Sequence, residues 1–198
     1  MSSRRDTEGL RIGMWLFLYS EIILFGGLFV LYAVYYHNYP EFFVEGGREL
    51  NRIIGAMNTV VLLVSSFTVA ASITAIQRGK ASQAAGFLLF SLACGMAFLI
   101  NKYFEWGSKI HHDIYPNSPT MQDAEPGLNI FFSLYYVITG LHGLHVIIGM
   151  VLLSISLVLV LRGRVNAGRF TMLENSGLYW HLVDLIWIFV FPMFYLVL

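Results

Sequence analysis

Two histidines in the middle of a long apolar stretch are the first residues whose type and spacing suggest chemistry. His142 and His145 lie in the sequence TGLHGLHVIIG, which carries no formal charge. A spacing of three residues places both on one face of a helix. Metal or haem ligation would need further ligands from another element, and His181 is the only candidate for a third one. We therefore predict that both histidines form hydrogen bonds between helices and bind no metal.

A carboxylate stands in the first apolar stretch of the chain. Glu21 lies between Phe17 and Phe25, and two glycines follow. An ionised carboxylate in hydrocarbon is costly unless it is paired, so this group is expected to hold a proton or to bond a neighbouring helix. Two interpretations stay open: a residue that exchanges protons or gates their passage, and a protonated carboxyl group that only joins helices.

A second polar cluster, YWHLVDLIW, lies in the last apolar stretch. His181 and Asp184 are three residues apart and can bond each other, which would neutralise the acid. Trp180 is close to a basic loop and is expected in the interfacial aromatic belt, whereas Trp187 lies deeper and should pack between helices. We predict that Trp180, His181 and Asp184 form a polar clasp between the last two membrane spans.

A basic loop precedes that stretch. Arg162, Arg164 and Arg169 cluster where an anionic lipid headgroup would lie, and each basic residue near such a surface contributes about 1 kcal/mol. They are therefore candidates for lipid binding. The alternative is that they only determine membrane topology.

The composition is that of a membrane protein. The 198 residues are 57% hydrophobic and 12% charged, with a mean hydropathy of +0.67 in the printed sequence. The net charge is zero, which gives no reason to expect a nucleic-acid partner. Cys94 is the only cysteine, which excludes an intrachain disulfide, a zinc–cysteine cluster and the paired cysteines of a dinuclear copper site.

Five apolar stretches predict an all-α transmembrane bundle, a single membrane domain covering residues 1–198. The predicted spans are approximately 12–36, 53–76, 84–104, 129–161 and 177–198. The first is longer than a secretory signal and contains a carboxylate, so we expect it to be retained. Residues 105–128 are predicted to form a loop with Glu105 at the water boundary, and Asn175 and Ser176 to cap the last span.

The basic residues predict the orientation of these spans. Most lysines and arginines fall on one side of a five-span chain, namely Arg4, Arg5, Arg11, Arg78, Lys80, Arg162, Arg164 and Arg169. By the positive-inside rule the N-terminus is cytoplasmic and the C-terminus lies outside.

Four segments together resemble subunit III of the haem–copper terminal oxidases, the cytochrome c oxidase subunit III family. They are residues 9–29 (GLRIGMWLFLYSEIILFGGLF), 102–106 (KYFEW), 139–149 (TGLHGLHVIIG) and 179–189 (YWHLVDLIWIF). The resemblance covers nearly the whole chain, in the manner of a short five-helix bacterial form. The mitochondrial-type subunit has seven spans and this chain begins at what would be its third, so the lipid-holding cleft to which the absent hairpin contributes is not expected to be complete.

The resemblance also implies roles for the polar residues. Glu21 matches the family's membrane-embedded glutamate, and His142 and His145 match its paired histidines. Trp180, His181 and Asp184 match its terminal-helix clasp.

By the same resemblance, the chain is expected to be a subunit without a redox centre in a proton-pumping terminal oxidase of the bacterial plasma membrane. Haem and copper would lie in subunits I and II, with no cofactor in this chain. Subunit I would be the main contact and subunit II, a small subunit IV and membrane lipids the others. The chain would stabilise subunit I and support proton uptake, without reducing oxygen itself.

Several alternatives stay open. A subunit III of a quinol oxidase and a homologue associated with nitric-oxide reductase fit the same motifs, because the electron donor is recognised by other subunits. A stand-alone transporter would show internal repeats or helices broken in mid-membrane. A b-type cytochrome would show histidine pairs on two facing helices. Neither pattern is found in the sequence.

Overall fold

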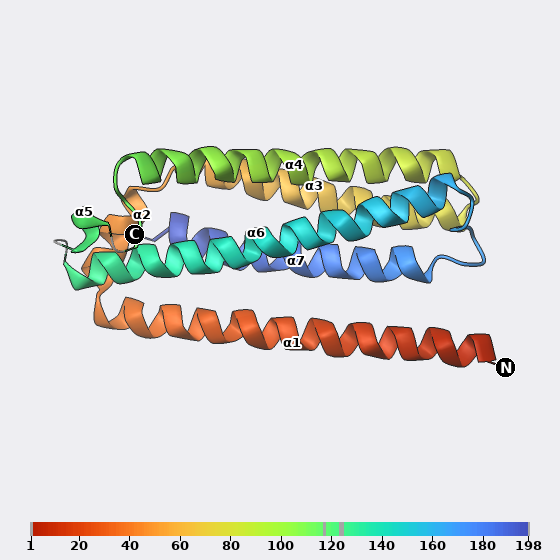
Figure 1. The fold of residues 1–198 in the computed structure, drawn as a ribbon, viewed down its shortest axis with the longest axis horizontal. Coiled ribbons are helices and arrows are strands. Elements are labelled where there is room, and N and C mark those ends of the chain that lie inside the picture. Colours follow the sequence, from red (N-terminus) through yellow and green to blue (C-terminus); the bar gives the residue numbers. More distant parts are fainter. Residues whose placement is uncertain (1, 117, 123–124, 198) are drawn as a thin grey trace.

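The computed structural model describes residues 2–116, 118–122 and 125–197, and it shows a bundle of long antiparallel helices (Figure 1). The helices are α1 (Ser2–Asn38), α2 (Pro40–Arg48), α3 (Arg52–Gln77), α4 (Ala81–His111), α5 (Pro119–Gln122), α6 (Pro126–Leu161) and α7 (Thr171–Tyr195). Five of them are long and apolar enough to cross a membrane, which confirms the predicted all-α fold with five spans. The side chains of Arg4 and Arg5, and the whole of Leu198, lie outside the described residues.

The helices extend beyond the predicted spans, and in α4 and α7 the extension overturns a prediction. α4 continues to His111, so Glu105 lies within the helix and is buried, not at the water boundary as predicted. α7 begins at Thr171, so Asn175 and Ser176 lie inside it and do not cap it. At the start of α7 the added turns are stabilised by tertiary packing: Leu173 is fully buried, and Ser176 bonds Ser156 of α6 at 2.9 Å.

The connection between the first two spans contains an additional helix, α2, which the sequence analysis did not predict. Pro40 begins it, and its apolar face covers the end of the bundle. Gly46 lies against the ring of Phe131 on α6, where a Cβ atom would overlap the ring. Its glycines therefore let α2 pack closely on α6 and α7 at one end of the bundle (Figure 1).

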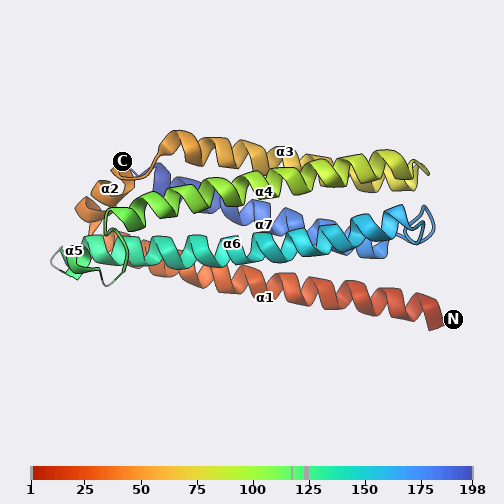
Figure 2. The same ribbon diagram turned by 45° about the horizontal axis from the view of Figure 1, so that its top comes forward.

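The helices contribute unequally to the core. The most apolar window of α7 is 50% buried, whereas that of α1 is only 11% buried. Trp180 and Trp187 of α7 are fully buried, and the ring of Trp180 fills the space left by Gly95 of α4 and Gly149 of α6. α7 is thus the central helix, and α1 lies along the outside of the bundle, as Figures 1 and 2 show.

The basic loops meet at one end of the bundle. The N-terminus, the α3–α4 turn and the α6–α7 loop lie together, and α2, α5 and the C-terminus lie at the other end (Figure 1). α3 and α6 each end in a glycine with positive φ, Gly79 at 73° and Gly163 at 67°. The following amides bond back to Ala75 and Leu159, which closes both helices tightly. The basic side chains flanking these turns are exposed.

Candidate functional site

Glu21 and His145 form the contact that joins α1 to α6. The Nε2 atom of His145 lies 2.8 Å from Oε2 of Glu21, and their side chains are only 9% and 13% exposed. The ring of Phe25, one turn after Glu21, packs edge-on against the imidazole at 5.3 Å between centroids. Tyr179 of α7 stacks on the same imidazole at 6.4 Å between centroids. The only carboxyl group in the first span is therefore paired, in aromatic surroundings.

The hydrogen bonds of His145 fix how many protons this pair holds. Nδ1 lies 2.7 Å from the carbonyl oxygen of Leu141, which can only accept, so Nδ1 carries a proton. One further proton must then lie between Nε2 and Glu21. The pair is either a carboxylic acid donating to a neutral imidazole or a carboxylate accepting from an imidazolium. Both forms have zero net charge, so the proton can shift between the two residues with no change in net charge at this depth.

His142 does not form the hydrogen bond that the sequence analysis predicts for it. Neither ring nitrogen has a partner among the described residues, and the side chain is fully buried. The ring packs instead against Trp187 at 5.0 Å and edge-on against Phe98 at 5.5 Å. The two histidines are three residues apart on α6, so their side chains leave the helix in somewhat different directions. His142 points into the aromatic core, and His145 points toward α1.

Two residues of the predicted clasp, Trp180 and His181, bond α3, the second span, instead of α6. The indole nitrogen of Trp180 donates to Ser65 at 2.9 Å, and Nδ1 of His181 lies 2.6 Å from the hydroxyl of Ser66. Trp187 donates to Thr59 at 3.1 Å. The predicted clasp between the last two spans is therefore wrong, because Trp180 and His181 bond α3 and not α6. Trp180 is also fully buried, so its predicted place in the interfacial aromatic belt is wrong as well.

Asp184 remains unpaired. Both carboxylate oxygens are buried and have no hydrogen-bond partner among the described residues, so the predicted bond to His181 does not form. Because the ring of His181 points to Ser66 on α3, it does not turn along its own helix toward Asp184. A buried, unpaired carboxyl group is unusual and requires an explanation.

The sequence analysis missed a buried network at the end of the bundle that carries α2. The amine of Lys102 lies 3.1 Å from Glu105 on the same helix, 2.9 Å from the Tyr135 hydroxyl and 3.0 Å from the Tyr195 hydroxyl. Both tyrosines donate to Oε1 of Glu105, at 2.8 and 2.6 Å. The i, i+3 spacing of the lysine and the glutamate was the available signal, but the predicted helix ended at residue 104, so Glu105 was expected at the water boundary. The network joins α4, α6 and α7.

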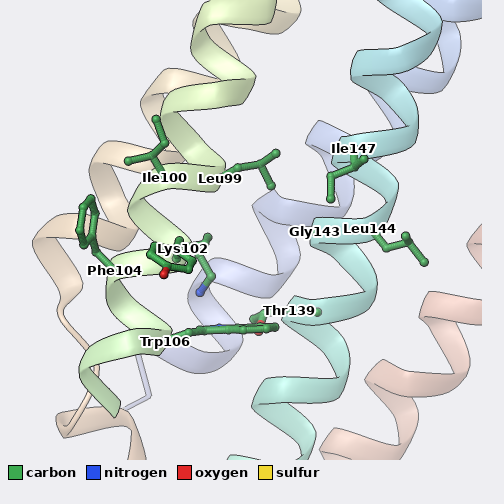
Figure 3. Close-up of a pocket in the computed structure, with 11 residues that line it drawn as sticks. Leu99, Ile100, Lys102, Phe104, Trp106, Thr139, Gly143, Leu144 and Ile147 are labelled. Atoms are coloured by element: carbon green, nitrogen blue, oxygen red, sulfur yellow. The ribbon is translucent and has the colours of Figure 1, made fainter. Parts of the chain in front are cut away.

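An apolar groove lies next to this network on the outer face of α4 and α6 (Figure 3). It has a volume of about 650 Å³, and the ring of Trp106 extends from α4 toward Thr139 and closes one end. Gly140 receives the edge of that ring, and Gly143 leaves open space further along. Gly140 and Gly143 of α6 thus border a groove on the surface of this chain.

The three arginines of the α6–α7 loop are all exposed. Arg162 follows the end of α6, and Arg164 and Arg169 lie in the short turn that follows it. At the same end, Arg11 of α1 pairs with Glu174 of α7 at 3.0 Å. The loop therefore presents its charge to the surroundings of the bundle.

The histidines do not converge as a ligand set. His145 faces Glu21, His142 lies among aromatic rings and His181 bonds Ser66. Over residues 2–116, 118–122 and 125–197, no three His, Cys, Asp or Glu side chains come together as they would around a metal ion.

Comparison with known proteins decides the family. A family model described as cytochrome c oxidase subunit III matches residues 3–197. The chain belongs to the cytochrome c oxidase subunit III family. Cytochrome c oxidase subunit 3 of Synechocystis is 32% identical over 93% of this chain and 74% of its own length.

Two other members of the subunit III family have informative names. Cytochrome bo(3) ubiquinol oxidase subunit 3 of Buchnera aphidicola is 31% identical over 93% of this chain and 92% of its own length. The heme-copper oxidase subunit I+III of Aeropyrum pernix is 30% identical over 96% of this chain, which covers 23% of that longer protein.

The segments that resemble subunit III meet in the bundle. Glu21 from the first segment bonds His145 from the third. The aromatic ring of Trp180 from the fourth packs on Gly149 of the third. Lys102 and Glu105 of the second lie in the network with Tyr135 and Tyr195. The motifs of subunit III in this chain are therefore mainly contacts between helices.

Proposed function

We propose that this subunit III family chain supports a haem–copper terminal oxidase in two ways, by stabilising its subunit I and by assisting proton uptake. The observation that carries the proposal is the Glu21–His145 pair. It places one transferable proton between α1 and α6, surrounded by apolar side chains. A helix contact alone would be satisfied by an amide, which cannot transfer that proton.

The partner in this proposal is subunit I, with subunit II and a small subunit IV further away. The relative named subunit I+III supports it, because a fusion of two chains indicates that they lie close together in the assembled protein. Haem and copper belong to subunits I and II in this proposal, and the chain itself has no catalytic role. Its residues would position helices and hold protons.

Small residues on α3 offer a surface to a partner helix. Ala70 and Thr74 are exposed and line a shallow groove of about 410 Å³ with Phe67 and Phe87. Small residues let a second helix approach closely within a membrane. Ser91 of α4, another small residue, is buried against α3 and already bonds Thr68 within this chain. We propose that this surface of α3 contacts a partner helix.

The basic end of the bundle faces the cytoplasm in this proposal. Arg11, Arg78, Lys80 and the arginines of the α6–α7 loop are exposed there, and the C-terminus lies at the opposite end (Figure 1). The electron donor stays open. The relatives named for cytochrome c oxidase and for ubiquinol oxidase have nearly the same identity to this chain, 32% and 31%.

Removal and restoration of the chain tests the proposal. The oxidase complex would be purified from cells with and without the chain, and oxygen reduction followed over many turnovers. We expect the complex without the chain to start at the normal rate, to take up protons more slowly and to lose activity sooner, and the restored chain to reverse this. Equal lifetimes and equal proton uptake would contradict the proposal. The subunits that co-purify with a tagged chain would identify its partners and the donor.

A further inference from the structure

A pocket opens between α1, α3 and α7 at the end of the bundle that carries the basic loops. Its volume is about 410 Å³, and Arg11, Glu174 and Asn175 supply polar groups to its wall. The ion pair between Arg11 and Glu174 spans it from α1 to α7. His181 also lines it, about 15 Å along α7 from Thr171 at 1.5 Å per residue. The pocket therefore connects charged side chains near the helix ends to an imidazole inside the membrane span.

The two nitrogens of His181 face different surroundings. Nδ1 lies 2.6 Å from the hydroxyl oxygen of Ser66. Nε2 has no protein partner among the described residues, and it is not one of the buried unpaired atoms. It is therefore available to a water molecule in the pocket. An imidazole with one nitrogen toward water and the other on a hydroxyl group can pass a proton between them.

The hydroxyl group of Ser66 leads to a carboxyl group. Ser66 interacts with the carboxyl group of Asp184, although no hydrogen bond joins the two side chains. Asp184 is 3% exposed, and neither of its oxygens has a partner among the described residues. His181 and Asp184 are separated by one helical turn on α7, so His181, Ser66 and Asp184 follow one another inward from the pocket. A buried carboxyl group that forms no hydrogen bond does not stabilise the fold through hydrogen bonding, so Asp184 calls for another explanation.

We propose that this pocket is a water-filled inlet through which Asp184 exchanges protons with the solution, by way of His181 and Ser66. A proton from pocket water adds to Nε2 of His181. The proton on Nδ1 passes to the oxygen of Ser66, whose own proton passes to the carboxylate of Asp184. The reverse sequence returns the proton to water. Each transfer breaks one N–H or O–H bond and forms another, so no other reactant is required.

This inlet is separate from the Glu21–His145 pair. That pair joins α1 to α6, whereas His181, Ser66 and Asp184 join α7 to α3. The inference goes beyond the proposed function because it concerns a second carboxyl group with its own access to water. It is tested at equilibrium, without turnover, so its failure would leave the proposed role of Glu21 untouched.

Infrared spectroscopy of the purified complex can follow Asp184 directly. A protonated carboxyl group has a C=O stretching band that shifts when its proton is replaced by deuterium. We expect a band that is lost in Asp184→Asn and that shifts soon after transfer of the wild-type complex into D₂O. In Ser66→Ala and His181→Phe the same band should remain, and its shift should be slower by about 100-fold, the lower end of what a positioned proton carrier contributes.

Ser154→Ala is the matched control, because it also removes a hydroxyl group from a membrane span, and Ser154 bonds the carbonyl of Met150 in its own helix. Its exchange rate should equal that of the wild type. If Asp184→Asn does not assemble, Asp184→Glu keeps the carboxyl group and should move the band. An equal exchange rate in Ser66→Ala, His181→Phe and the control would overturn the inlet. The absence of any band that depends on Asp184 would overturn it as well.

Discussion

Oε2 of Glu21 lies 2.8 Å from Nε2 of His145, and the other nitrogen of that histidine is held by the Leu141 carbonyl. One proton therefore has two places to reside, on α1 or on α6. The outermost helix of the bundle is joined to the inner helices by a bond that can also transfer a proton.

Glu21→Gln separates these two roles of the bond. The amide can donate to Nε2 of His145, so we expect normal assembly and a normal initial rate of oxygen reduction. It cannot exchange that proton, so proton uptake should slow or inactivation should come sooner over many turnovers. Glu41→Gln is the control, because Glu41 is exposed on α2. Unchanged proton uptake and lifetime in Glu21→Gln would leave only the structural interpretation.

The two histidines of α6 should respond differently to substitution. His145→Leu leaves Glu21 without a partner, which costs about 1–3 kcal/mol, and should release the chain from the complex at a lower detergent concentration. His142→Leu breaks no hydrogen bond with a described residue, so its cost should be limited to its packing on Trp187 and Phe98.

The haem spectrum should be unchanged in both histidine variants. A lost or shifted haem or copper signal, in a variant that keeps all its subunits, would show that this chain binds a metal. Equal loosening in His142→Leu and His145→Leu would contradict the difference expected from their hydrogen bonds.

The Lys102–Glu105 pair should stabilise the fold only as a pair. Either Lys102→Met or Glu105→Leu leaves one buried charge without its partner, at a cost of about 3–5 kcal/mol. The double variant leaves neither charge, and we expect it to be more stable than either single variant. Denaturation of the purified chain in mixed micelles, followed by circular dichroism, measures this. A double variant that loses the sum of the two single losses would show that the pair is not coupled.

The orientation can be tested by labelling introduced cysteines. Ser82→Cys lies at the basic end of the bundle and Thr120→Cys at the other, both at exposed positions, in a chain whose native cysteine is removed by Cys94→Ala. A thiol reagent that does not cross the membrane, added to intact spheroplasts, should modify only Thr120→Cys. The neighbouring Ser118 is unsuitable because it is fully buried. Modification of Ser82→Cys alone would reverse the orientation.

The α6–α7 loop should retain anionic lipid. Replacement of Arg162, Arg164 and Arg169 by glutamine removes three exposed positive charges, each contributing about 1 kcal/mol near an anionic surface. We expect less cardiolipin or phosphatidylglycerol in the purified complex by mass spectrometry. Arg78→Gln with Lys80→Gln is the control at the same end of the bundle. Equal lipid content in both variants and the wild type would leave the arginines as topology determinants only.

The sequence by itself determined the fold class, the number of membrane spans and the family. These follow from properties summed over many residues: apolar length, the distribution of lysine and arginine, and four motifs in order. The limits of the helices were less certain from sequence. The sequence analysis placed Glu105 at the start of a loop, because charged residues are frequent in the segment that follows it. In the structure α4 continues for another six residues past Glu105, to His111.

Only the tertiary structure decided which polar side chains meet. Helical spacing places His142 with His145, and His181 with Asp184, on common faces, but it does not say which helix each face meets. In the bundle His145 reaches α1, His181 reaches α3, and His142 and Asp184 reach no hydrogen-bonding partner among the described residues. The physical reason is that a hydrogen bond depends on a few tenths of an ångström and on direction. The distances and directions between side chains are set by how whole helices pack, for example where the ring of Trp180 lies against Gly149.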